Sequence, residues 1–398
     1  MANVSSSNGL EKYPKLRFKG FSEPWREIII GDLFKVTRGY VLPSSAVKEE
    51  PQDEYIFPVY SSQTKNEGLM GYYNEYLYED AITWTTDGAN AGTVHYRDGK
   101  FYCTNVCGVL LNEDGNANRC VAEILGSVSK KYVSYVGNPK LMNNVMSEIR
   151  IHIPSVVEQK RIDELLTVID LRITKQRELI DHLKKYKRGA IEAIFNRTIS
   201  FASNTGDSWK EFRLGEFARR ITRKNGQTTD IPLTISAQYG LIDQREFFSK
   251  TVASSDMSGY YLLHKGEFAY NRSTSSEYPF GSIKRLDKYD KGAVSTLYLC
   301  FDANEEIMDS DFIMWYFESS RWHNGVREIC AEGARNHGLL NVPTAGFFDT
   351  VHYLPSNKAE QKRIAAFLST IDERYTRAFS ELEELNNLKK GLYQRLFI

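Results

Sequence analysis

An acidic residue followed two positions later by lysine occurs at three places in the sequence, and metal-dependent nucleases often use this pattern. The three segments are Asp98-Gly99-Lys100, Glu158-Gln159-Lys160 and Glu360-Gln361-Lys362. The first lacks a Pro-Asp partner at a plausible spacing. The other two lie where helices are expected to begin, and a glutamate has a structural role there. The pattern therefore does not predict a nuclease.

The motifs of other DNA-modifying reactions are absent. No Asn/Asp-Pro-Pro-aromatic turn is present to hold a flipped adenine, and no Gly-x-Gly cofactor loop follows a strand. The phosphate-cradling loop of helicase motors is also missing. The seven histidines are scattered, and we interpret His95 and His152 as structural because they lie in strand-like stretches. We expect the chain to have no catalytic residues of its own.

The amino-acid composition narrows the class of protein further. The chain has 398 residues, of which 41% are hydrophobic and 26% charged, as in ordinary globular proteins with two or three domains. It has no secretory signal and no long apolar run, so we expect a cytoplasmic protein without a membrane partner. Because the net charge is zero, any contact with nucleic acid must come from local clusters or from a partner.

The five cysteines argue against a disulfide framework because their number is odd. Cys103 and Cys107 are four residues apart, which leaves a metal pair as one interpretation. No second pair follows at the spacing of a zinc site, so buried reduced cysteines on a strand are the favoured interpretation. We predict no metal site.

The segment EQKRI occurs twice, at Glu158–Ile162 and Glu360–Ile364, and the match continues without a gap to Phe195 and Phe397. In both copies, apolar residues alternate at steps of four and three, which is the heptad pattern of a coiled coil. A lysine, Lys187 or Lys389, interrupts both patterns at the same place. A proline and a capping box precede each copy, with the glutamate expected to reach back to the helix start.

The regions before the two helices also match in outline. Trp25-Arg26-Glu27 corresponds to Trp209-Lys210-Glu211, and both regions contain short alternating strands with polar loops. We predict an α+β fold: two globular mixed α/β domains separated by two long antiparallel coiled-coil helices, related by a pseudo-two-fold internal repeat. The expected boundaries are residues 1–153 and 199–354 for the domains, and 154–198 and 355–398 for the helices.

This arrangement resembles the specificity subunit of type I restriction–modification systems. The resemblance rests on PSVVEQKRIDELLTVID and PSNKAEQKRIAAFLSTID, each leading into a Leu/Lys-rich helix, and on WREIIIGDLF and WKEFRLGEF at the start of the two globular halves. It implies two target recognition domains that read a bipartite DNA sequence at a spacing set by the helices. The chain would direct adenine methylation and restriction by partner subunits without being an enzyme itself.

The resemblance also implies the partners and cofactors. The partners would be double-stranded DNA, two modification (methyltransferase) subunits and restriction (endonuclease/translocase) subunits. S-adenosylmethionine, Mg²⁺ and ATP would be bound by those subunits and not by this chain. Two alternatives remain open: a related system in which the partner is a fused methylase–nuclease, and a coiled-coil scaffold that does not bind DNA.

Base readout needs polar side chains presented from loops, and four segments of each half qualify. In the first half they are residues 35–40, 60–68, 83–92 and 137–144; in the second they are 219–227, 235–246, 271–281 and 333–341. The residues expected to bind DNA are Lys35, Thr37, Arg38, Tyr40, Ser61, Ser62, Gln63, Lys65, Thr85, Thr86, Asn90, Arg220, Arg223, Lys224, Asn225, Ser236, Gln238, Tyr239, Asn271, Arg272, Ser273, Ser275, Arg335 and Asn336. Matched positions predict one surface on each domain.

Lys160, Arg161, Lys362 and Arg363 are the candidate partner-binding residues. They are expected in the first helical turn, where the helix dipole disfavours positive charge. Helix stability alone would not favour basic residues at these positions, so we expect them to make a contact. The contact is either with a methyltransferase subunit or a local salt bridge with the adjacent domain.

Overall fold

The computed structural model describes residues 14–62, 65–201, 208–236, 239–247, 256–330 and 338–397, except for the side chains of Lys65 and Phe247. The chain divides into two compact units. The first unit comprises Met1–Arg177 and Glu381–Ile398, and the second comprises Glu178–Ser380. Each long helix therefore contributes one half to each unit.

The first unit is built around a six-stranded sheet, in which all neighbouring strands are antiparallel except β3 and β6. Its spatial order is β2 (Lys35–Arg38), β7 (Cys107–Leu111), β5 (Tyr78–Thr85), β6 (Val94–Cys103), β3 (Phe57–Tyr60) and β4 (Leu69–Tyr73). The remaining elements are the strand pair β1 (Arg26–Ile29) and β8 (Arg150–Ile153), the helices α1 (Ile30–Leu33), α2 (Arg119–Ser129) and α3 (Asn143–Glu148), and three short 3₁₀ segments, Ser44–Ala46, Lys65–Gly68 and Lys130–Tyr132.

The second unit has a four-stranded antiparallel sheet in the order β10 (Ala218–Ile221), β17 (Leu299–Ala303), β14 (Phe268–Asn271) and β15 (Ser282–Arg285). Three strand pairs accompany it: β9 (Trp209–Arg213) with β18 (Val351–Pro355), β11 (Leu233–Ser236) with β12 (Gly240–Asp243), and β13 (Tyr261–His264) with β16 (Lys291–Val294). The helices are α5 (Leu214–Phe217), α6 (Gln244–Phe247), α7 (Ser310–Phe317), α8 (His323–Ile329) and α9 (Thr344–Asp349).

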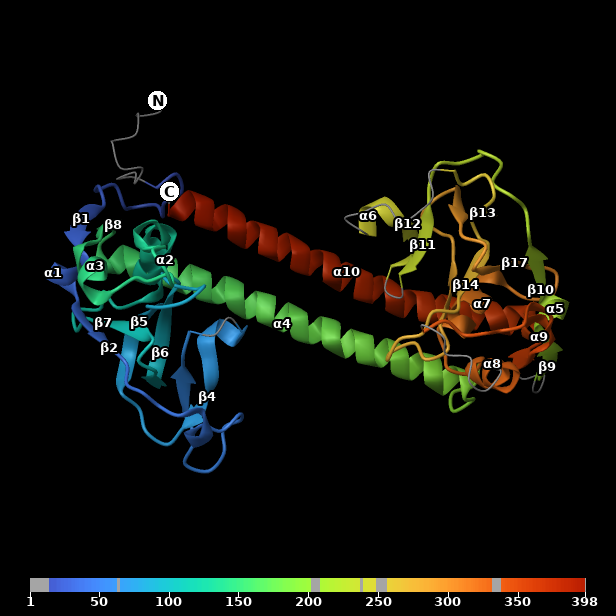
Figure 1. The fold of residues 1–398 in the computed structure, drawn as a ribbon, viewed down its shortest axis with the longest axis horizontal. Coiled ribbons are helices and arrows are strands. Elements are labelled where there is room, and N and C mark those ends of the chain that lie inside the picture. Colours follow the sequence, from blue (N-terminus) through green and yellow to red (C-terminus); the bar gives the residue numbers. More distant parts are fainter. Residues whose placement is uncertain are drawn as a thin grey trace. The chain divides into compact units, whose positions relative to one another are not determined.

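The two sheets share a core topology. The order β2-β7-β5-β6 in the first unit corresponds to β10-β17-β14-β15 in the second, and in both a strand pair joins the start of the globular region to the strand before the long helix. Figure 1 labels β2, β7, β5 and β6 of the first unit and β10, β14 and β17 of the second. The weak match between the two globular halves of the sequence therefore reflects a structural repeat. The second unit differs by its two additional strand pairs, β11–β12 and β13–β16, which form a second apolar core together with Ile221, Ala269 and Cys300 of the four-stranded sheet.

The two long helices are α4 (Val156–Phe195) and α10 (Lys358–Leu396). Every residue of the two predicted heptad seams is buried or half-buried, which agrees with the periodicity of the sequence. In the first unit, Leu396 of α10 joins the core formed with Ile162 and Leu166 of α4. In the second unit, Ile194 of α4 joins the core formed with Ile364 and Leu368 of α10. Each unit thus buries the start of one helix beside the end of the other.

The lysines that interrupt the seams are paired across the two helices. In the second unit, Lys187 Nζ lies 2.5 Å from Asp372 Oδ1, and in the first unit Lys389 Nζ lies 2.8 Å from Asp170 Oδ1. Arg119 of α2 also contacts Asp170. Although burial raises the pKa of Asp170, hydrogen bonds from Lys389 and Arg119 outweigh it and hold that pKa below its usual range. The interruptions in the sequence are therefore equivalent polar contacts, one in each unit.

The two EQ pairs anchor the long helices to their globular regions. Gln159 is fully buried, accepts a hydrogen bond from Asn118 Nδ2 (2.6 Å) and donates to Pro154 O (2.9 Å). Gln361 is equally buried, accepts from the backbone N–H of Asp309 (2.8 Å) and donates to Pro355 O (2.8 Å). Asn118 and Asp309 are the N-caps of α2 and α7, so each glutamine ties a long helix to the first turn of the shorter helix beside it.

The expected capping role of the glutamates is wrong. Ser155 does accept from the backbone N–H of Glu158 (3.4 Å), but the carboxylate of Glu158 binds Arg17 through two hydrogen bonds of 2.7 and 2.8 Å. In the second copy, the carboxylate of Glu360 accepts from Ser208 and from the indole of Trp209. Both glutamates are buried, and they join the helix to the strand or segment that opens the globular region. The side chains of Ser155 and Asn357 still accept from the helix start, but each glutamate binds a partner outside the helix and does not reach back to the cap.

Among the described residues, no helix combines the length and the apolar character that a membrane span requires.

Candidate nucleic-acid interface

Three of the predicted segments of the first unit meet at the connection between β6 and β7. The backbone N–H of Gly39 donates to Cys107 O (3.0 Å), that of Thr86 to Val106 O (2.9 Å), and that of Thr104 to Tyr60 O (2.9 Å). These bonds place the ends of β2, β5 and β3 around one turn. β2 and β5 are antiparallel to β7, so their ends lie beside its start, and β3 is parallel to β6, so the two strands end at the same edge. The segments 35–40 and 83–92 and the described part of 60–68 therefore lie together.

The fourth segment of the first unit joins the same edge. The backbone N–H of Leu141 donates to Thr86 O, and that of Gly88 donates to Pro139 O, each at 2.9 Å. The amide of Asn143 donates to Thr37 O (3.3 Å), which connects the fourth segment to the first. All four segments, separated by up to about a hundred residues in the sequence, thus form one continuous set of loops in the first unit.

The second unit brings together only part of its predicted set. The backbone N–H of Leu340 donates to Arg272 O (3.0 Å), as Leu141 does to Thr86 in the first unit, and the guanidinium of Arg272 donates to Leu297 O (2.9 Å) in the turn before β17. The segment 271–281 and the described end of 333–341 therefore lie together. The segment 219–227 starts within β10, paired with β17, and its later residues run along β13, where the N–H of Leu262 donates to Arg223 O.

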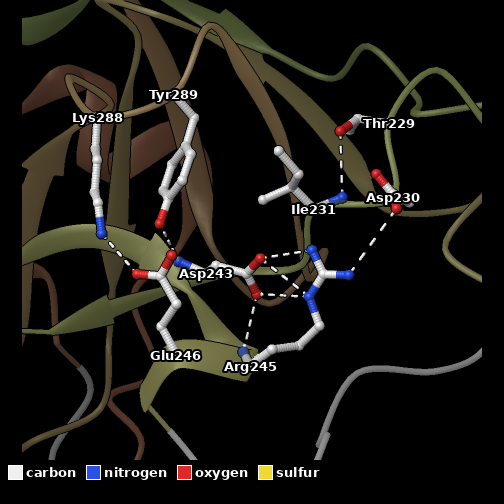
Figure 2. A network of polar contacts seen from close by, with 8 residues as sticks. All are labelled: Thr229, Asp230, Ile231, Asp243, Arg245, Glu246, Lys288 and Tyr289. Atoms are coloured by element: carbon white, nitrogen blue, oxygen red, sulfur yellow. Dashed lines mark hydrogen bonds and ion pairs between the residues drawn. The ribbon is translucent and has the colours of Figure 1, made fainter.

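The segment 235–246 forms the β11–β12 hairpin and leads into α6, where a polar network holds it (Figure 2). Hydrogen bonds from Arg245 lower the pKa of Asp243. On the other side of the turn, Lys288 lies 2.6 Å from Glu246, and the Tyr289 hydroxyl accepts from the N–H of Asp243. This network fixes the hairpin against the connection between β15 and β16. Among the described residues, this network makes no hydrogen bond or ion pair with the segment 271–281, although β12 lies against β15, which follows that segment. A single surface on the second domain stays a prediction.

The individual candidate residues fall into four groups by exposure. Exposed side chains are available to a ligand, and they are Lys35, Arg38, Tyr40, Arg220, Arg223, Lys224, Tyr239, Ser273 and Ser275. The half-buried ones are Thr37, Ser61, Ser62, Asn90, Asn271 and Arg272. The buried ones are Thr85, Thr86, Asn225 and Ser236. Gln63, Gln238, Arg335, Asn336 and the side chain of Lys65 lie outside the described residues.

The four buried residues hold the loops and do not reach the surface in this conformation. The hydroxyl of Thr86 lies 2.7 Å from Asp87 Oδ2 and 3.0 Å from Val106 O. The side chain of Asn225 accepts from the N–H of Thr229 and donates to Thr229 O, which closes a turn. The side-chain polar atoms of Thr86, Asn225 and Ser236 already have partners inside the unit, which favours loop support, and base contact by the four residues stays a prediction.

Some exposed cations are also engaged within the unit. Arg223 forms an ion pair with Glu267 (2.7 Å), and the Lys224 ammonium donates to Gly259 O (2.9 Å). Arg38 donates to Asn105 O (3.2 Å). Within the described part of the chain, each of these side chains keeps further donors without a partner, since a guanidinium has five N–H groups and an ammonium three.

Arg97 supports the interface and could not be identified from the sequence. Its side chain is 6% exposed, and its guanidinium lies 3.6 Å from the centre of the Tyr60 ring. It donates to Glu67 O (2.7 Å) and to the hydroxyl of Thr83 (3.1 Å). Burial lowers the pKa of Arg97. The sequence signal was only an arginine at an inward position of an alternating strand, which does not reveal that it clamps the segment 60–68.

The two cysteines considered as a metal pair lie at the ends of β6 and β7, and both are buried and free. Burial raises the pKa of both the Cys103 and the Cys107 thiol, the latter to about 11. Within the described ranges, no group of three or more His, Cys, Asp or Glu side chains is arranged to hold a metal ion.

The four basic residues of the EQKRI copies lie in the second turn of their helices and not in the first, because α4 begins at Val156 and α10 at Lys358. Arg161 is paired with Glu164 (3.1 Å), and Arg363 donates to Phe201 O (2.8 Å). Lys160 and Lys362 are exposed and make no hydrogen bond or ion pair with the described part of the chain.

The chain is similar to known proteins in both sequence and fold. A family model described as "Type I restriction modification DNA specificity domain" matches residues 22–185. A protein of Mycoplasma pneumoniae named as the N-terminus of a type I specificity subunit is 39% identical over 140 residues, which cover 34% of this chain and 73% of that protein. Another type I specificity subunit of the same organism is 26% identical over 92% of this chain and 96% of its own length.

A solved structure has a similar fold. The crystal structure of the S subunit of a type I restriction–modification system from M. genitalium matches with a TM-score of 0.61, over 97% of this chain and 99% of the other. Sequence identity in that alignment is 15%, so the likeness concerns the fold.

Proposed function

Because this chain belongs to the specificity subunits of type I restriction–modification systems, we propose that its two globular units read the two halves of a bipartite DNA sequence. A specificity subunit is the non-catalytic member of its complex, in agreement with the missing catalytic motifs. The observation that carries the proposal is the meeting of four polar segments at one edge of the sheet in the first unit. Loops held by a rigid scaffold are where proteins commonly place their binding residues.

Within this function, the exposed polar residues of the loops supply base and phosphate contacts. Lys35, Arg38 and Tyr40 would act in the first unit, and Arg220, Tyr239 and Ser273 in the second. In the second unit, the loops that lie together around Arg272 and Leu340 would contact the duplex, and the β11–β12 hairpin would add further contacts.

The long helices would pair as an antiparallel coiled coil and set the gap between the half-sites. The buried seams and the equivalent contacts Lys187–Asp372 and Lys389–Asp170 support this part of the proposal. The proposed domains are residues 1–153 and 199–354, and the proposed helical segments are 154–198 and 355–398. Two unlike recognition units on one pair of helices would give two unlike half-sites at a constant distance.

The proposed partners follow from the same function. Double-stranded DNA is the ligand, and two methyltransferase subunits and the restriction subunits assemble with the chain. S-adenosylmethionine, Mg²⁺ and ATP would be bound by those partners. A single fused methylase–nuclease partner is the alternative. Co-purification of the chain with its partners distinguishes a separate methyltransferase subunit from a fused methylase–nuclease. The zero net charge favours a complex in which the partners supply much of the phosphate contact.

Exchange of one recognition unit tests the proposal. Residues 1–150 are replaced by the corresponding region of another specificity subunit, and methylated adenines are mapped across the genome of a host carrying the complex. We expect only one half of the methylated motif to change, because the second unit is intact. The unmodified chain in the same host is the control. A motif that changes in both halves would contradict separate reading by the two units.

We further propose that Lys160 and Lys362 lie at the docking surfaces of the two methyltransferase subunits. Their exposure without an internal partner supports this role, whereas the contacts of Arg161 and Arg363 favour local support of the helices. For a Lys160→Ala and Lys362→Ala double variant, we expect weaker recruitment of methyltransferase, measured by native mass spectrometry across a concentration series. The matched control is Arg161→Ala with Arg363→Ala. Unchanged recruitment by the lysine variant would rule out the role.

A further inference from the structure

The candidate interface of the first unit is extended by a loop that the residue-level predictions omitted, namely residues 130–140, which we call the basic–aromatic loop. It contains Lys130, Lys131 and Lys140, and no acidic residue occurs between Lys130 and Asn144. Tyr135 is 71% and Val136 92% exposed. A basic patch with aromatic residues is typical of a surface that binds nucleic acid.

The base of this loop is fixed. Ser134 and Lys140 exchange two backbone hydrogen bonds of 2.8 and 2.9 Å. Val133 and Leu141, on either side of the tip, are buried in the core of the unit. The backbone is therefore held in place while the side chains at its tip have almost no packing. Binding through such a tip avoids most of the entropy loss of ordering a loop.

The loop lies directly beside the candidate interface. The N–H of Leu141 donates to Thr86 O, the N–H of Gly88 donates to Pro139 O, and Lys140 lies 3.9 Å from Asp87. Asp87 is the one acid in ion-pair contact with the loop in the described part of the chain. Lys130 and Lys131 remain exposed and have no such contact there. The charge of the loop favours a polyanion over an ordinary protein surface.

We propose that the basic–aromatic loop is a DNA-contacting element of the first unit, in which the lysines contact phosphates and Tyr135 and Val136 contact bases in the groove. This inference rests on the proposed function and deepens it. Apolar side chains can contact thymine methyl groups or enter a base step, and neighbouring phosphate contacts hold them in register. The tip would therefore contribute to sequence discrimination, and the lysines to affinity for any duplex.

The test uses the full chain assembled with its methyltransferase subunits, and duplexes with and without the methylated motif. Affinity is measured between 50 and 200 mM salt. For Lys130→Ala with Lys131→Ala, we expect weaker binding to both duplexes and a salt slope reduced by about two. For Tyr135→Ser with Val136→Ser, we expect binding to the motif about tenfold weaker and binding to the other duplex unchanged.

Matched controls lie elsewhere in the same unit. Lys15→Ala with Lys19→Ala removes two exposed lysines of the opening segment, and Tyr76→Ser removes a tyrosine before the start of β5, at the other end of that strand from Thr85. Both controls should bind like the unmodified complex. Because all the altered loop side chains are exposed, melting temperatures should not change.

The outcomes separate the two proposals. If the unmodified complex selects the motif and the loop variants bind as it does, the loop inference is wrong and the proposed function stands. If the unmodified complex does not select any motif, both are wrong. A third outcome is that the loop variants lose a methyltransferase subunit in native mass spectrometry while the DNA affinity of each assembled complex is unchanged. The loop would then be a protein interface, and the inference that it contacts DNA would be wrong.

Discussion

Gln361→Leu is expected to destabilise the second unit by about 3 kcal/mol, because it leaves buried polar groups without partners. Gln361 is fully buried and satisfies the N–H of Asp309 and the carbonyls of Pro355 and Ile307. Leucine has a similar size but no polar atom. The lost hydrogen bonds lie where α10 meets α7 and β18. The junction between this helix and the globular region should therefore unfold locally before the rest of the second unit.

Hydrogen exchange of the full chain measures this effect locally. Peptides from α7 and β18 should exchange faster in Gln361→Leu, and peptides from α2 should not change. Gln159→Leu is the counterpart in the first unit and should have the smaller effect, because two of its partners are the side chains of Asn116 and Asn118, which can turn to other partners. Lys362→Gln, at the exposed neighbouring position, is the control. Equal exchange in Gln361→Leu and the unmodified chain would show that the glutamine does not hold the junction.

Insertion of one heptad into both long helices is expected to widen the gap between the half-sites by about three base pairs while leaving each half-site unchanged. Seven helical residues add about 10 Å, and one base pair spans about 3.4 Å along the duplex. The insertions follow Arg177 in α4 and Ser380 in α10, at the boundaries of the two units. At these positions every contact within each unit is preserved, and a seven-residue insertion keeps the seam in phase.

Mapping of methylated adenines gives the result directly. A heptad inserted into α4 alone is the matched control, and it should abolish methylation because the two seams no longer correspond along their length. A double insertion that methylates the original motif with its original gap would show that the helices do not set the spacing.

The sequence repeat predicted the long helices because the spacing of apolar residues along a helix is set by local helix geometry and can be recognised without knowing any distant contact. Both seams, both helix ends near Phe195 and Leu396, and the equivalence of the two globular regions follow from this pattern. The lysines in the seams were visible in the sequence, but their partners were not. Asp372 lies 185 residues from Lys187, and no local rule connects two residues at that distance.

The candidate interface was predictable as a set of segments and much less as individual residues. Polar loops after short strands were recognised in the first unit, where strand pairing brings all four together. Whether a threonine at a strand end faces the solvent or the neighbouring turn depends on the twist and pairing of the sheet, and Thr86 faces the turn. The glutamate of the helix start was misassigned for a similar reason, because Arg17 reaches it from a segment about 140 residues earlier.

The division of the chain into units also determines the order in which they can be completed during synthesis. The second unit is one uninterrupted stretch, Glu178–Ser380, whereas the first combines Met1–Arg177 with Glu381–Ile398. The core of the first unit includes Leu396 and Phe397, and the N–H of Leu16 donates to Arg395 O. A ribosome therefore supplies every residue of the second unit before it supplies those that close the core of the first. The first unit is therefore completed only after residues 381–397 have been made, and both units become available to DNA only from that point.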